Sequence, residues 1–400
     1  MQQPPSVPVL TYARVRPALK REVDAKKTLH RCLAQQPGRP VLHVATKPGV
    51  PVVVEEDGST SATDARTFEL DGVFDEGADT DAVYDATGRP LVDAVLTGVN
   101  GTILCYGMTG SGKTHTILGD PESLGIVGLA AHQLFAAAER GSAAASIECS
   151  FMQLYGTVAT DLLVAKSAPS PLKIARRDDE VVVEGLSRRL VSTVDDVNAL
   201  ITEGVSRRKV ASQRLNSASS RSHAVLTFYV TSVQTDGGRQ GDKGDAAAAA
   251  AAAATATGDG DGDDDDDDET VVARCAKLVC VDLAGSERVK ESSVSGTALR
   301  EAQEINLSLF HLIRVVQVLN EQSTHPTSNR RWDRGASRVP YSDSPLTLLL
   351  SDALGGAPCH LLPFHPPTPR PPPRANPPHV DSPPQSPAPP PPSGAPPRTR

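Results

Sequence analysis

The chain has few of the features that identify common classes of protein. Only 4% of its 400 residues are aromatic, and its six cysteines lack the CxxC spacing of a zinc site or a disulfide framework. It contains no run of about 18 apolar residues, so no membrane span is expected. Its first residues lack the charged and apolar regions of a secretory signal. These absences predict a cytoplasmic protein without a membrane partner.

The net charge of −8 comes from one short tract. Nine acids lie between Asp259 and Glu269, and without them the acids and bases of the chain balance to within one charge. A near-neutral body produces no global field that would attract a polyanion. We therefore expect no nucleic-acid partner.

Two segments have compositions that do not build a packed core. Residues 235–270 contain nine consecutive alanines and the acidic tract, which predicts a disordered insertion between two strands. Residues 357–400 hold more than half of the 34 prolines and predict a disordered, polyproline-like tail. The tail could bind a domain of the SH3 or WW type, or simply extend from the folded part. The folded domain is predicted to span residues 9–356.

Strand patterns and helical patterns alternate within this domain. Alternating or short apolar runs predict strands within residues 7–17, 100–107, 146–155, 222–233 and 275–282. A three-to-four-residue apolar repeat predicts a long helix from Ala298 to Gln322. Strands that alternate with helices predict an α/β domain of three layers.

A glycine-rich segment follows the second predicted strand and satisfies the pattern GxxxxGK[ST]. Its glycines allow backbone N–H groups to surround anionic oxygens, and the next helix directs its positive end at them. Lys113 can reach the β- and γ-phosphates of a nucleotide, and the Thr114 hydroxyl can ligate Mg²⁺. The predicted phosphate-binding loop comprises Gly107, Met108, Thr109, Gly110, Ser111, Gly112, Lys113 and Thr114.

Two more loops carry polar residues suited to the same chemistry. Asp282 ends the strand KLVCVD, so its carboxylate is expected at the carboxyl edge of the sheet, although such residues often only cap a turn. Gly285 can offer a backbone N–H to a γ-phosphate. Arg221 in NSASSRSHA and Glu287 in DLAGSER could pair if both loops close. A serine-rich loop, taken alone, more often only faces solvent.

Three stretches together resemble the P-loop, switch I and switch II of the kinesin motor domain, in order and spacing. They read YGMTGSGKTHT, NSASSRSHA and VDLAGSER. The resemblance covers residues 9–356 apart from the insertion. It implies a P-loop NTPase motor fold, with a central, mostly parallel β-sheet flanked by helices. It also implies a microtubule-stimulated ATPase that moves on the microtubule cytoskeleton, with ATP as substrate and Mg²⁺ as cofactor.

The resemblance assigns roles to individual residues. It places Arg14, Pro17 and His115 at the base of the nucleotide, with Tyr84 less directly nearby. It places Thr114 and Ser220 at Mg²⁺, and Asp282 at the same ion through water. Closure on the γ-phosphate and arrangement of the attacking water are assigned to Ser219, Ser220, Arg221, Gly285 and Glu287.

The expected microtubule contact departs from the family. Ser342, Pro345 and Leu348 stand where the family has bases that meet the acidic tubulin surface. Other bases could replace them or could remain solvated without a partner: Arg288, Lys290, Arg330, Arg331, Arg334 and Arg338.

The end of the domain departs from the family as well. After DALGG the family continues with one more core strand and a final helix, whereas this chain continues APCHLLPFHPPTPRPPP. Because prolines do not fit a central strand, the sequence predicts that this strand and helix are absent. The alternatives to a complete motor are therefore a non-motile protein that binds ATP or tubulin, and a truncated motor that has lost motility. A P-loop kinase lacks support, because no acceptor-binding lid is visible.

Overall fold

The computed structural model describes the residues that form the folded core. These are residues 9–18, 33–36, 38–45, 52–54, 65–120, 122–140, 144–165, 171–177, 180–214, 219–235, 271–287, 297–324, 339–354 and 359–365. Both the predicted insertion, beyond Thr235, and the chain after His365 lie outside this set.

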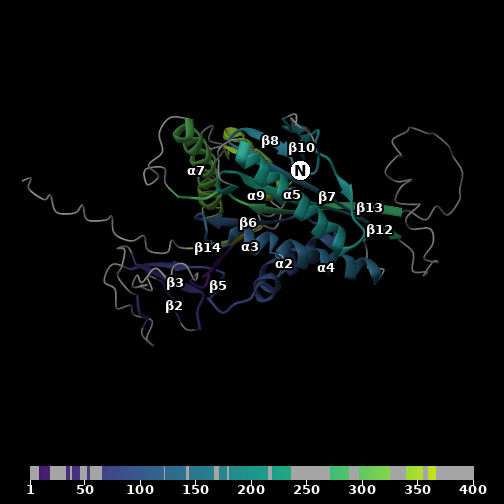
Figure 1. The fold of residues 1–400 in the computed structure, drawn as a ribbon. Coiled ribbons are helices and arrows are strands. Elements are labelled where there is room, and N and C mark those ends of the chain that lie inside the picture. Colours follow the sequence, from purple (N-terminus) through teal and green to yellow (C-terminus); the bar gives the residue numbers. More distant parts are fainter. Residues whose placement is uncertain are drawn as a thin grey trace, which may run out of the picture.

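A central sheet runs through the molecule between layers of helices (Figure 1). The strand order is β11-β7-β12-β13-β6-β14-β1-β5, and β8 pairs with β7. The strands are β1 (Leu10–Arg14), β5 (Gly72–Phe74), β6 (Gly101–Gly107), β7 (Ala144–Tyr155), β8 (Val158–Asp161), β11 (Arg189–Leu190), β12 (His223–Thr235), β13 (Val271–Asp282) and β14 (Cys359–His365).

Alternating side chains of this sheet build a hydrophobic core on each face. In β6, Ile103 and Cys105 belong to one cluster and Leu104 to the other, as the two-residue period of a strand requires. The first cluster packs under α2 (Thr80–Leu96), α4 (Ile126–Glu139) and α5 (Val194–Arg214). The second packs under α7 (Thr297–Thr324) and α8 (Pro345–Leu349). The α/β fold in three layers is confirmed.

The sheet is mixed, whereas the sequence predicted a mostly parallel one. β5, β1, β14, β6 and β13 are parallel neighbours. β12 pairs antiparallel with both β13 and β7, and β8 and β11 pair antiparallel with β7. The β12–β13 ladder is long, because it pairs every residue from Ala224 to Thr235 with one from Asp282 to Val271.

The prediction that the last core strand is absent is wrong. β14 lies between β6 and β1 and is parallel to both, with Leu361 opposite Leu104 and Thr11. Its ladder with β6 becomes irregular between Leu362 and His365, which is where Pro363 falls. Proline has no N–H to donate, and an irregularity is the position at which a strand tolerates it. The domain therefore extends to His365, beyond the predicted boundary at residue 356.

The other elements complete the layers. The predicted long helix is confirmed as α7. α8 begins with Pro345 behind a capping box at Ser344, so the proline is accommodated in the first turn. No helix in the described ranges is long and apolar enough to cross a membrane. The remaining elements are α3 (Lys113–Leu118), α9 (Ser351–Leu354), η1 (Ser219–Arg221), η3 (Tyr341–Asp343), β2 (Leu33–Gln35), β3 (Val41–Ala45), β4 (Ala65–Glu69), β9 (Lys173–Arg177) and β10 (Glu180–Glu184).

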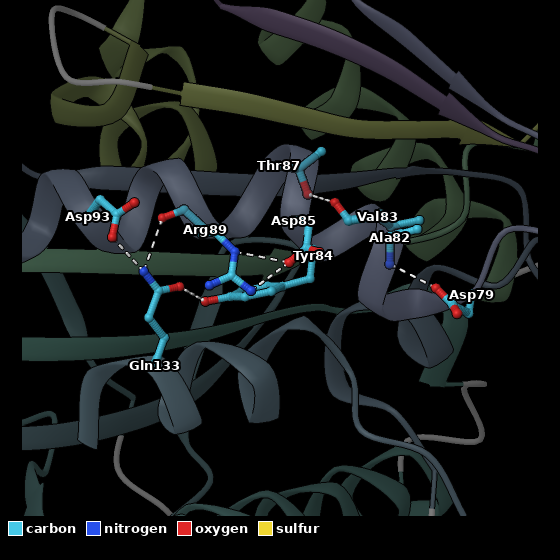
Figure 2. Close-up of polar contacts among 9 residues, drawn as sticks. All are labelled: Asp79, Ala82, Val83, Tyr84, Asp85, Thr87, Arg89, Asp93 and Gln133. Atoms are coloured by element: carbon cyan, nitrogen blue, oxygen red, sulfur yellow. Dashed lines mark hydrogen bonds and ion pairs between the residues drawn. The ribbon is translucent and has the colours of Figure 1, made fainter. Parts of the chain in front are cut away.

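A polar network joins α2 to α4 (Figure 2). The Tyr84 hydroxyl donates to Gln133 of α4, and the Gln133 amide donates to Asp93 at 2.6 Å. Only 3% of Tyr84 is exposed, and a Cβ on Gly88 would strike its ring. The Tyr84 side chain therefore joins the two helices, and its expected place near the base of a nucleotide stays a prediction.

Removal of β14 should destabilise the domain strongly. A chain that ends at Gly356 leaves β6 and β1 without their common neighbour, whereas a chain that ends at His365 keeps it. The loss of a central strand costs several kcal/mol, so we expect the shorter chain to unfold at least about 10 °C lower, or to be insoluble. Thermal unfolding followed by circular dichroism compares the two, with the full chain as reference. Equal midpoints for both truncated chains would contradict the placement of β14.

Candidate nucleotide site

Three loops meet at one edge of the sheet because of the strand register. β6 ends at Gly107 and β13 ends at Asp282, which lies opposite Cys105 of β6. β12 runs the other way and begins at His223, with Ala224 opposite Asp282. Ligands of α/β sheets bind at such carboxyl edges. The structure thus brings together the three stretches on which the family resemblance rests.

The glycine-rich loop adopts a backbone that requires glycine. Gly110 has φ 77° and Gly112 has φ 106°, both in the left-handed region that side chains disfavour. The Ser111 hydroxyl between them is buried and has no hydrogen-bond partner within the described structure. A buried polar atom without a partner costs free energy. A bound phosphate oxygen would supply that partner.

Lys113 is held under the loop. Only 7% of it is exposed, and its Nζ donates to the carbonyls of Gly107 and Met108, each at 2.8 Å. Burial lowers the pKa of its ammonium group. An anionic oxygen above the loop would be a stronger acceptor than either neutral carbonyl.

Asp282 is the buried anion of the site. The Thr114 hydroxyl and the Arg208 Nη1 both donate to its Oδ2, each at 2.7 Å. Its Oδ1 is buried and has no partner within the described structure. One carboxylate beside a hydroxyl is the oxygen-donor set that Mg²⁺ takes together with substrate phosphates and water. These residues therefore fit a Mg²⁺ ion, with the free Oδ1 available to a water ligand of the metal.

Arg208 is a residue that sequence reasoning missed. It lies on α5, and apart from Asp282 it donates to the Ser222 hydroxyl at 3.2 Å and to the Ser222 carbonyl at 2.6 Å. It therefore joins the loop before β12 to the end of β13. The sequence offers no local signal for this role, because Arg208 is one of several bases on a polar helix. Only the fold shows that it is buried while Arg207 is not.

Backbone contacts hold the loops after β6, before β12 and after β13 together. The Gly285 N–H donates to the Ser220 carbonyl at 2.8 Å, and the Ser286 N–H donates to the Gly107 carbonyl at 3.1 Å. A Cβ on Gly285 would overlap the Glu287 carboxylate and the Thr109 hydroxyl. Gly285 is therefore required for close approach, and its N–H is already engaged by the opposite loop.

Glu287 contacts the glycine-rich loop. Its Oε2 accepts the Thr109 N–H at 3.0 Å, and its Oε1 accepts the Thr109 hydroxyl. Burial pushes the pKa of Glu287 up, but the bonds from Thr109 outweigh it and the pKa falls below its usual value. The described side-chain hydrogen bonds of Glu287 go to Thr109, and none of them goes to Arg221. Because Thr109 satisfies the carboxylate here, the pair with Arg221 stays a prediction for a closed arrangement.

The other predicted residues surround this centre. Ser219, Ser220 and Arg221 form the 3₁₀ turn η1, directly before β12. The side chain of Ser219 lies outside the described set, whereas Ser220 and Arg221 are half-buried. His115 lies beside Asp120, with 3.3 Å between its Nε2 and a carboxylate oxygen.

The RxRP stretch contacts the neighbouring elements, and its expected place at the base of a nucleotide stays a prediction. Arg14 is 9% exposed and donates to Thr116 at 3.0 Å and to Thr80 at 3.3 Å, so it ties β1 to α3 and α2. Pro17 is exposed. Arg16, which sequence reasoning passed over, donates to the Gly110 carbonyl at 3.0 Å. Arg14 thus shapes the site through its neighbours, and Arg16 is the arginine that contacts the phosphate loop.

The predicted microtubule-binding bases fall outside the described residues, so their role stays an expectation. They are Arg288, Lys290, Arg330, Arg331, Arg334 and Arg338.

Comparisons with known proteins agree with this geometry. Residues 14–362 match the family described as the kinesin motor domain, and the match reaches into β14. The kinesin-like protein cut7 of Schizosaccharomyces pombe is 31% identical over 77% of this chain and 26% of its own length. The kinesin heavy chain of Gibberella moniliformis is 31% identical over 80% of this chain and 30% of its own length. This chain thus spans less than a third of either relative.

A solved structure of a fast kinesin is similar over 89% of this chain and 84% of its own, with a TM-score of 0.66 and 28% identity. The family match covers most of the chain and contains all three loops of the site. The chain therefore belongs to the kinesin motor domain family.

Proposed function

We propose that this domain hydrolyses ATP and couples the hydrolysis to binding and movement on microtubules of the cytoskeleton. The observation that carries the proposal is the meeting of Lys113, Asp282 and the Gly285–Ser220 contact at one sheet edge. Family membership supports it. The similar fast-kinesin structure is described in terms of an ATPase mechanism and interactions with microtubules, which supports the same activity in this chain.

Nucleotide binding uses groups that already face the loop. The Lys113 ammonium exchanges its two carbonyl acceptors for phosphate oxygens, and Ser111 gains the partner that it lacks. Thr114 and Asp282 would hold Mg²⁺, with Ser220 proposed as a further ligand. When bound, this ion supplies neutralisation of charge on the β- and γ-phosphates.

Hydrolysis requires closure of the two switch loops. The Gly285 N–H, now bonded to the Ser220 carbonyl, is released to a γ-phosphate oxygen, which is the stronger acceptor because it is charged. Glu287 leaves Thr109 and pairs with Arg221, whose positive charge then favours the ionised carboxylate in place of the bonds from Thr109. The pair, with Ser219 and Ser220 beside it, positions the attacking water.

The microtubule contact is proposed to flank α7. Bases at Arg288 and Lys290 precede this helix in the sequence, and Arg330, Arg331, Arg334 and Arg338 follow it. Exposed charge pairs with an acidic surface contribute about 0.2–1 kcal/mol each, so several are needed to replace the bases missing at Ser342, Pro345 and Leu348.

The purified chain should hydrolyse ATP slowly, and microtubules should accelerate phosphate release. The physical reason is that phosphate release from the closed site is coupled to α7, the helix that the microtubule would bind. A coupled-enzyme phosphate assay with and without polymerised tubulin measures both rates, with the Lys113→Ala variant as blank. Equal rates with and without microtubules would favour the alternative of a non-motile binding protein.

Arg221→Ala should stop turnover without preventing nucleotide binding. Arg221 is assigned to the closed state only, so its loss should lower the hydrolysis rate about 10²–10³-fold. The dissociation constant of a fluorescent ATP analogue should change less than about twofold, because binding rests on Lys113 and the loop. Arg89→Ala is the control, since Arg89 pairs with Asp85 on the surface of α2. Loss of binding in Arg221→Ala would contradict the assignment.

Arg208→Ala should destabilise the fold far more than a change at its neighbour. It leaves the buried Asp282 carboxylate without its charged partner, which costs about 3–5 kcal/mol of the free energy of unfolding. Arg207→Ala breaks a partly exposed pair with Glu203 and a hydrogen bond to the Leu162 carbonyl, and should cost about 1–2 kcal/mol. Urea unfolding of the two variants measures the difference. Similar losses would show that the Arg208–Asp282 pair does not hold the site together.

A further inference from the structure

His223 is a buried imidazole that the proposed hydrolysis does not use. It is the first residue of β12, directly after the turn that carries Ser220 and Arg221, and only 1% of it is exposed. It stands between the loop after β13 and the helix α7.

Both ring nitrogens of His223 are engaged, and each contacts a different element. Nδ1 lies 3.0 Å from the backbone N–H of Ala284, which can only donate, so Nδ1 is the acceptor. The ring proton is therefore on Nε2, which lies 3.0 Å from the Ser308 hydroxyl of α7 and donates to it. Burial, with the nearby charges of Arg208 and Lys113, lowers the pKa of His223 to about 3, so the ring stays neutral.

Ala284 is adjacent to Gly285, and this adjacency connects His223 to the phosphate side. The Gly285 N–H bonds to Ser220, and the preceding N–H, that of Ala284, bonds to His223. A movement of this backbone toward a terminal phosphate therefore changes both contacts together. At the other end, Ser308 is 5% exposed and lies in the buried side of a 28-residue helix, so a change at its hydroxyl is transmitted to a rigid element.

We propose that His223 is a positioning residue that links the loop after β13 to α7, through hydrogen bonds to Ala284 on one side and Ser308 on the other. The proposal rests on the proposed nucleotide-dependent function, and it names the atoms that couple the loop after β13 to α7. A purely structural histidine would fill the core and satisfy two polar groups, but removal of one bond would not alter how α7 responds to nucleotide.

The test measures hydrogen exchange of α7 amides with and without Mg²⁺ and a non-hydrolysable ATP analogue, in the full chain and without microtubules. In the wild-type chain the analogue should change exchange within residues 297–324. Ser308→Ala removes the acceptor of the His223 Nε2–H, and we expect the α7 response to fall about threefold to thirtyfold while protection of the phosphate loop is retained.

Three variants serve as checks. Ser308→Thr keeps the hydroxyl and should retain the response. Ser150→Ala removes another buried serine hydroxyl, which bonds to Tyr229 at 3.4 Å, and should also retain it. His223→Asn keeps an acceptor for the Ala284 N–H, but its side chain does not reach Ser308. It should therefore show the same loss of the α7 response as Ser308→Ala. If Ser308→Ala does not fold, His223→Asn takes its place in the test.

A full α7 response in Ser308→Ala or His223→Asn would overturn the proposal, as would the absence of a response in the wild-type chain. Failure of microtubules to accelerate hydrolysis contradicts the proposed function separately, because the exchange measurement uses neither hydrolysis nor the track.

Discussion

The candidate nucleotide site depends on one buried carboxylate, that of Asp282. It ends β13, and its Oδ2 receives hydrogen bonds from Thr114 at the start of α3 and from Arg208 on α5. Removing one partner of such a pair leaves a charge in the protein interior, which costs several kcal/mol. The carboxylate therefore fixes three elements relative to one another. Its second oxygen is left for the chemistry of the site.

The sheet explains why these elements meet. Parallel neighbours β6 and β13 end together, and antiparallel β12 begins where they end. The glycine-rich loop, the Asp282 carboxylate and the turn η1 thus come from three distant parts of the sequence to one edge. β14 fills the position between β6 and β1, so the strand that carries the phosphate loop has a neighbour on both sides. The geometry of the site therefore depends on the same strand pairs that stabilise the sheet.

The sequence predicted those features whose signal is local. The phosphate loop follows from glycine spacing, and Asp282 follows from its place at the end of an apolar strand. Arg208 could not be predicted, because its burial depends on how α5 packs over the loop before β12. β14 was predicted to be absent because prolines do not fit a central strand. The structure shows that one proline at a ladder irregularity is compatible with a central strand.

The contacts at Glu287 and Gly285 escaped prediction for a different reason. The resemblance assigned Arg221 as the partner of Glu287, and the sequence offered the Gly285 N–H to a γ-phosphate, whereas the structure shows Glu287 with Thr109 and Gly285 with Ser220. The assigned partners stay predictions for a closed arrangement of the same loops. A sequence pattern can suggest which residues act together, but it does not fix the arrangement in which their loops are found.

The energies of these contacts determine how such a switch can work. A neutral hydrogen bond such as Gly285–Ser220 contributes about 0.5–1.5 kcal/mol, and a bond to a charged group about 1.5–3 kcal/mol. One exchange of a carbonyl for a phosphate oxygen therefore gains about 1–2 kcal/mol. To invert a population from 1:99 to 99:1 requires about 5.5 kcal/mol. Several exchanges must therefore occur together. The loops can act as one unit because Gly285, Ala284 and Glu287 lie within four residues of one backbone, so a single movement of that segment changes all of their bonds.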